Sequence, residues 1–169
     1  MRMRAAGFYF AALWAALCAV FVLAPGIVRL AAQEYNAGQI AIAQAWAPPT
    51  LGRQRIGVAY FTISNAGVDA DRLLGIDLPR GGRAQIHISQ LQDGVLRMRP
   101  ADKPVIPAHG MLVLEPGGMH VMLSDLPGPL LKGGVIQLNL HFEKAGQVLV
   151  EAAVEARKPV SAQPSHQGH

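Results

Sequence analysis

The sequence predicts an all-β fold, an antiparallel β-sandwich or barrel preceded by an N-terminal hydrophobic export segment. Short apolar runs recur from about residue 39 to residue 157, and turn residues separate them. Glycine and proline are plentiful, with 18 and 12 residues, whereas aromatic residues make up only 6% of the chain. This composition suits many short strands joined by turns, and no helical periodicity stands out after residue 32.

Residues 1–32 are predicted to be a signal peptide or a membrane anchor. Two arginines in Met1–Arg4 precede an uncharged stretch, Ala5–Val28. This stretch is longer than the usual signal-peptide core of roughly 7–15 residues, and it reaches the roughly 20 residues that span a bilayer. We favour cleavage after Leu30-Ala31-Ala32, with an uncleaved anchor as the alternative.

Both readings of the leader place the rest of the chain outside the cytoplasm, because the basic end stays inside. We therefore expect a periplasmic protein that is tethered to the inner membrane only if the segment stays uncleaved. Cys18 is the only cysteine, and Leu17 beside it argues against a lipoprotein site. The remaining chain therefore has no disulfide or thiolate chemistry.

Nine strands are predicted in residues 33–157, which we assign to one domain. Val135–Phe142 alternates most cleanly, with Leu138 and Leu140 on one face and Asn139 and His141 on the other. Residues 158–169 lose this pattern and are predicted to be a disordered tail. The strands are Ile40–Trp46, Val58–Ser64, Arg72–Leu78, Ala84–Leu91, Val95–Arg99, Met111–Glu115, His120–Leu123, Val135–Phe142 and Val148–Ala156.

The charge distribution argues against a nucleic-acid partner. The chain carries a net charge of +4, but Arg2, Arg4 and Arg29 lie in the leader, which has no acidic residue. The remainder therefore carries 4 − 3 = +1, too little for a surface that binds a phosphate backbone.

Four side chains are candidate metal ligands: His87, Met98, His120 and Met122. Asp93-Gly94 predicts a two-residue hairpin turn, in which Gln92 pairs with Val95, Ser89 with Met98 and His87 with Pro100. Met98 then lies diagonally across from His87 on one face. His120 and Met122 are two residues apart on a strand and also share a face. The sequence does not show whether the two faces meet.

Two imidazoles and two thioethers favour a soft ion, and thioether sulfur favours Cu(I). The other histidines and methionines are interpreted as ordinary residues. Met111 and Met119 are predicted to fill the core, His109 to lie in a turn and His141 on a solvent face. His166 and His169, in the tail, could form an auxiliary Cu(II) site, but we expect none.

The spacing His-x10-Met-x21-His-x-Met resembles the signature of the periplasmic copper chaperones called PCuAC. The similarity extends from about Ile40 to Val154, with Met119 where the family commonly has tyrosine, and Ile88-Ser89 where an acidic or polar residue and often a methionine occur. Further matching segments are Ala45–Pro48, Val58–Asn65, Gly94–Pro100, Pro116–Leu123, Pro129–Gly133 and Phe142–Gly146.

The resemblance implies a cupredoxin-like, monomeric carrier of Cu(I), with His87, Met98, His120 and Met122 as ligands. It also implies delivery of copper to the CuA site of cytochrome c oxidase subunit II, alongside Sco-type thiol proteins. The competing interpretation is a structural or adhesive β-sandwich whose histidines and methionines bind nothing. A hydrolytic enzyme is disfavoured, because the sequence has no nucleophile elbow, zinc-protease helix or close carboxylate pair.

Overall fold

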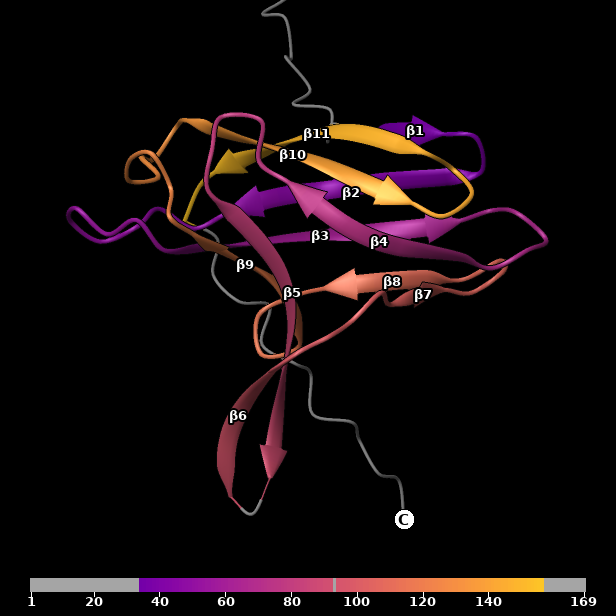
Figure 1. Cartoon of the computed structure of the whole chain (residues 1–169), viewed down its shortest axis with the longest axis horizontal. Coiled ribbons are helices and arrows are strands. Elements are labelled where there is room, and N and C mark those ends of the chain that lie inside the picture. Colours follow the sequence, from indigo (N-terminus) through magenta and orange to yellow (C-terminus); the bar gives the residue numbers. More distant parts are fainter. Residues whose placement is uncertain (1–33, 93, 157–169) are drawn as a thin grey trace, which may run out of the picture. The chain divides into compact units, whose positions relative to one another are not determined.

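The computed structural model describes residues 34–92 and 94–156, and their regular secondary structure is entirely β-strand (Figure 1). None of these residues forms a helix long and apolar enough to cross a membrane. The predicted export segment, the predicted tail and Asp93 lie outside the described residues. The strands are β1 Tyr35–Ala37, β2 Ile40–Ala47, β3 Gly57–Asn65, β4 Asp71–Asp77, β5 Arg83–Gln92, β6 Val95–Pro100, β7 Val105–Ile106, β8 Met111–Leu114, β9 Met119–Ser124, β10 Val135–Phe142 and β11 Gln147–Val154.

Hydrogen bonds join the strands into one sheet of 11 strands, in the order β6-β5-β9-β3-β2-β11-β10-β4-β7, with β1 on β2 and β8 on β3. Figure 1 shows β1, β10 and β11 on one side of β2 and β3, and β7 and β8 on the other. The all-β class is confirmed, but the purely antiparallel pairing is wrong, because β11 runs parallel to β2. That pair joins the two ends of the domain, a long-range contact that alternation within a strand does not reveal.

The core is formed by alternate apolar residues of the curved sheet. Leu138, Leu140 and Phe142 are buried on β10, which confirms the predicted inner face of that strand. Val121 and Leu123 are buried on β9. Because successive side chains of a strand point to opposite faces, His120 and Met122 lie on the face away from this core.

A β-bulge in β2 brings two aromatic residues together on the outer face. Ala43 pairs with Thr62, but the next pair is Trp46 with Tyr60, so β2 carries one more residue than β3 between these pairs. The extra residue is absorbed at Gln44, which adopts a φ of 57°. The Trp46 and Tyr60 rings lie 4.8 Å apart between centroids, and Ala47 beyond them is fully buried.

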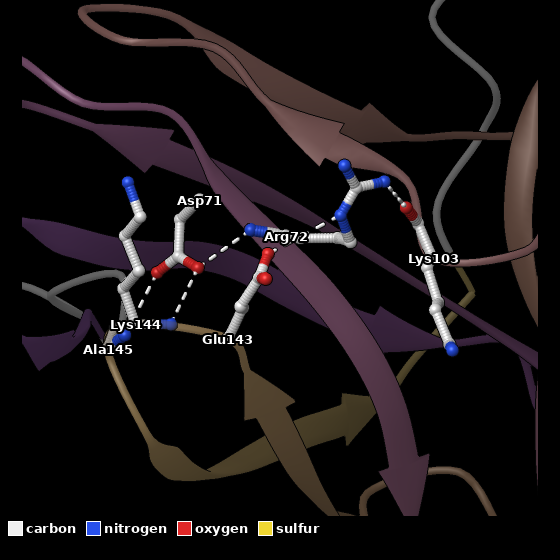
Figure 2. Close-up of polar contacts among 6 residues, drawn as sticks. All are labelled: Asp71, Arg72, Lys103, Glu143, Lys144 and Ala145. Atoms are coloured by element: carbon white, nitrogen blue, oxygen red, sulfur yellow. Dashed lines mark hydrogen bonds and ion pairs between the residues drawn. The ribbon is translucent and has the colours of Figure 1, made fainter.

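A buried carboxylate ties the start of β4 to the turn between β10 and β11 (Figure 2). Asp71 is 5% exposed, and its carboxylate accepts hydrogen bonds from the backbone N–H groups of Arg72, Lys144 and Ala145 at 2.7 to 3.0 Å. Arg72 also pairs with Glu143 at 3.4 Å, with both side chains about half exposed. The backbone bonds satisfy the carboxylate and hold this end of the domain together.

Strands β5 and β6 form a hairpin that extends away from the rest of the domain (Figure 1). The predicted register is confirmed: Gln92 pairs with Val95, Ser89 with Met98 and His87 with Pro100. All of β6 is exposed, and β6 is an edge strand. Neither face of the hairpin is buried at residues 90–92 and 94–97.

Candidate metal centre

The two central histidines lie directly opposite each other on adjacent strands. His87 of β5 pairs with His120 of β9, and the ring centroids are 6.0 Å apart with an angle of 67° between the planes. The neighbouring pair Ile86 and Val121 is buried on the core side. Burial of that apolar pair holds the register, because a slip of one residue would turn both histidines into the core.

His120 is the buried member of the pair, with 5% exposure. Its Nδ1 lies 3.1 Å from the Gly118 carbonyl oxygen. That oxygen also accepts a hydrogen bond from the Ser89 N–H at 3.2 Å, and the Gly118 N–H donates to the Glu115 carbonyl at 3.1 Å. The Pro116-Gly117-Gly118 turn therefore aims a fixed acceptor at the His120 ring.

His87 is half-buried and contacts the side chain of Gln85, two residues earlier on the same face of β5. Its Nε2 lies 3.1 Å from Gln85 Oε1. Sequence reasoning missed Gln85, although a polar residue at position i−2 on a strand is always a neighbour on the same face.

Met122 lies beside the histidine pair on the same outer face. It is half-buried and is two residues from His120 on β9. Its cross-strand partners are Gln85 on β5 and Val58 on β3. The structure therefore brings three of the four predicted ligands, His87, His120 and Met122, onto adjoining positions of two strands.

Met98 shares this face by register but lies farther out, and its 61% exposure is the largest of the four candidates. Met98 pairs with Ser89 on one side of His87, and Met122 pairs with Gln85 on the other. On a flat sheet their Cα atoms would be about 17 Å apart, given a rise of about 3.4 Å per residue and a strand spacing of about 4.8 Å. A methionine reaches a metal roughly 6.5 Å from its Cα, with a metal–sulfur bond of about 2.3 Å. Both sulfurs can therefore bind one ion only where the twisted hairpin curves over the face.

The sequence left open whether the face with His87 and Met98 meets the face with His120 and Met122. The structure shows a simpler arrangement. All four candidate ligands lie on one face of β6-β5-β9, because β5 pairs with both other strands. Met98 itself is not covered by any other part of the described chain, and it is 61% exposed. Both faces of β6 are exposed.

The aromatic pair Trp46 and Tyr60 continues the same row across the sheet. Tyr60 is two residues from Val58, the partner of Met122, and it follows Ala59, the last residue of β3 that pairs with β9. Burial raises the pKa of the Tyr60 hydroxyl. No sequence pattern predicted this position of Tyr60, because the bulge at Gln44 and the pairing of β3 with β9 decide it.

The separation of the two imidazole rings is compatible with a single metal ion bound to both. With one nitrogen of each ring bound at about 2.0–2.1 Å, the centroids would be roughly 5 Å apart for a tetrahedral ion and roughly 6.3 Å for a linear arrangement. The observed 6.0 Å lies within that interval. Within residues 34–92 and 94–156, no three His, Cys, Asp or Glu side chains cluster closely enough to hold a metal. The other two candidate ligands on this face, Met98 and Met122, are thioethers, which suit Cu(I).

The remaining predicted residues lie elsewhere. Met119 packs against the core, as predicted, but Met111 is 63% exposed, so its predicted role as core filler is wrong. The strand bearing Met111 pairs only on one side, and its outer face is uncovered. His109 is exposed in a turn with a φ of 51°, and His141 pairs with Asp77 at 2.7 Å. His166 and His169 lie outside the described residues.

Comparison with known proteins gives the family. The family described as "Putative lipoprotein LpqE-like" matches residues 40–154. "Uncharacterized protein RP573" of Rickettsia prowazekii (strain Madrid E) is 29% identical over 120 residues, 69% of this chain and 66% of that protein. "Putative lipoprotein Lxx21020" of Leifsonia xyli subsp. xyli (strain CTCB07) is 28% identical over 108 residues, 63% of this chain and 64% of that protein. The chain thus spans slightly less than two thirds of the length of these relatives.

The fold is similar to that of a solved copper-binding domain. The structure called "Copper-bound PCuAC domain from PmoF2" has a TM-score of 0.63 and 30% sequence identity, and the match covers 74% of this chain and 99% of that one. This agrees with the resemblance inferred from the ligand spacing. The chain belongs to the LpqE-like family, and its domain is a member of the PCuAC group.

Proposed function

We propose that this protein is an extracytoplasmic Cu(I) metallochaperone and not an enzyme. The observation that supports it best is the cross-strand pair His87 and His120, 6.0 Å apart between centroids, with Met122 on the same face. Two neutral imidazoles and a thioether form a soft, uncharged ligand set, which suits a monovalent soft ion. The copper-bound PmoF2 domain, of the same fold, supports copper as the ion.

The unequal exposure of the ligands suits a carrier that must release its ion. His120 is 5% exposed and bonded to a fixed carbonyl, whereas Met98 is 61% exposed on the hairpin. A ligand of an incoming partner can replace Met98 without opening the domain. We therefore propose that His120 is the anchor of the site and that Met98 binds last and leaves first.

The recipient is proposed from the PCuAC resemblance alone. It is the CuA site of cytochrome c oxidase subunit II, with Sco-type thiol proteins acting alongside. The family and the Leifsonia relative are both named as putative lipoproteins, which supports a location for this protein at the outer side of the cytoplasmic membrane. Mixing the copper-loaded protein with the copper-free, reduced CuA domain tests the recipient, because loading restores CuA absorption after oxidation. Copper that stays on the chaperone after mixing would contradict this destination.

Competition for Cu(I) against a chromophoric chelator tests the function itself. Wild type should hold one Cu(I) per chain. His120→Ala and Met122→Leu should bind it at least roughly 10–100-fold more weakly, the range lost when even a supporting residue of a metal site is removed. His109→Ala and Met111→Leu are matched controls, because both residues are exposed away from the histidine pair. Equal binding by the site variants and the controls would refute the proposal and leave the structural β-sandwich interpretation.

A further inference from the structure

The two histidines have different hydrogen-bond partners on opposite ring atoms. His120 uses Nδ1 toward the Gly118 carbonyl, and His87 uses Nε2 toward Gln85 Oε1, both at 3.1 Å. A carbonyl oxygen accepts hydrogen bonds and cannot donate them, so in the neutral rings each of these nitrogens carries the proton. The lone pair is then on Nε2 of His120 and on Nδ1 of His87.

We infer that Gln85 is a positioning residue that makes His87 bind copper through Nδ1, while Gly118 makes His120 bind through Nε2. This inference rests on the proposed function, because it takes the two rings as ligands of one ion. A metal-bound histidine commonly donates its other ring N–H to a carbonyl or carboxylate, and that bond holds the tautomer and the ring orientation. Here a backbone carbonyl serves one ring and a side-chain amide serves the other.

Gln85 is placed for this role by the sheet. It shares the outer face of β5 with His87, and its cross-strand partner is Met122. Gln85 therefore lies next to two of the proposed ligands, the His87 imidazole and the Met122 thioether. Gln85 is exposed, so its substitution removes the contact to His87 without opening the core.

The two supports differ in strength. The Gly118 carbonyl is held by a turn and by the Ser89 N–H. The Gln85 amide is on a flexible, exposed side chain. We expect the His120 ring to keep its orientation throughout copper exchange, whereas the His87 ring is released when the Gln85 contact breaks.

Nitrogen-15 NMR of the imidazole rings tests the inference before any metal is added. In alkaline buffer the two neutral tautomers of an imidazole are distinguished by their ring nitrogen shifts. In the metal-free protein His120 should carry its proton on Nδ1 and His87 on Nε2. The opposite tautomer at either ring would overturn the assignment for that ring.

Titration with Ag(I) then identifies the nitrogens that bind the metal. Ag(I) is a soft ion that is not oxidised in air, and its nucleus has a spin of ½, which splits the signal of a bound nitrogen. Splitting by silver should appear on Nδ1 of His87 and on Nε2 of His120. Splitting on Nε2 of His87 would overturn the role of Gln85 and leave the proposed function intact. The absence of splitting on both rings would overturn the proposed function, and the inference with it.

Variants of Gln85 separate positioning from general stability. Gln85→Leu should weaken Ag(I) and Cu(I) binding roughly 10-fold or more and spread the silver splitting over both nitrogens of His87. Gln85→Glu keeps an oxygen acceptor and should restore the Nδ1 splitting. Gln90→Leu is the matched control, an exposed glutamine on the opposite face of the same strand. Binding by Gln85→Leu equal to that by Gln90→Leu would refute a positioning role.

Discussion

Replacing each central histidine by alanine should affect copper-dependent stability equally and metal-free stability unequally. His87 and His120 are cross-strand partners with rings 6.0 Å apart, so either change removes one of two imidazoles from the same proposed site. They differ in burial, because His120 is 5% exposed and His87 is partly open to solvent.

The metal-free magnitudes follow from this difference. His120→Ala leaves a cavity and removes the donor to the Gly118 carbonyl, a loss of about 2–3 kcal/mol in the free energy of unfolding. For a domain of this size that lowers Tm by roughly 8–12 °C. His87→Ala removes a half-exposed cross-strand contact and should cost less than about 1 kcal/mol.

The loss of stabilisation by copper should be the same for both variants. With free Cu(I) at a hundredfold excess over the wild-type Kd, binding stabilises the fold by about 2.7 kcal/mol. If either variant binds a hundredfold more weakly, the same copper concentration adds only about 0.4 kcal/mol. The Tm gain on adding copper should thus fall from roughly 11 °C to roughly 2 °C in each variant.

Thermal unfolding followed by circular dichroism, with and without buffered Cu(I) under reducing conditions, measures both terms. His109→Ala provides the control, because its exposed turn histidine should change neither. If His87→Ala kept the full copper-dependent gain, the paired arrangement of the two rings would not be the binding site. Equal metal-free losses in both variants would contradict the burial argument.

Three further predictions concern other parts of the chain. Asp71→Ala removes the acceptor of three backbone N–H groups and should lower the free energy of unfolding by about 3 kcal/mol in urea titrations, whereas exposed Asp69→Ala should not. Because burial raises the pKa of Tyr60 in the folded state, its stabilising contribution should be fully present below pH ~10 and lost as pH rises through the folded pKa. Urea titrations from pH 8 to 11 should show a smaller loss of unfolding free energy in Tyr60→Phe than in wild type. The same pH dependence of the unfolding free energy in both proteins would refute this prediction. Mass spectrometry of the exported protein should find Gln33 as its first residue, and an acylated Cys18 would instead identify a lipoprotein.

Local chemistry in the sequence was sufficient for nine of the 11 strands and for the hairpin register. The alternation in Val135–Phe142 predicted its buried face, and Asp93-Gly94 predicted that Ser89 pairs with Met98. Both depend on neighbours within a few residues. The short strands β1 and β7 were missed, because three and two residues carry too little pattern, and Met111 was misassigned because the sequence does not show which strand faces stay uncovered.

By itself, the sequence determined the candidate ligands, their grouping into two His/Met pairs and the soft character of the ion, since these follow from residue type and strand period. Only the tertiary structure decided that β5 lies next to β9, which makes His87 and His120 direct partners and places Gln85 beside them. Pairing between strands about 30 residues apart depends on which apolar faces pack together across the whole domain. That choice is not written in either strand alone.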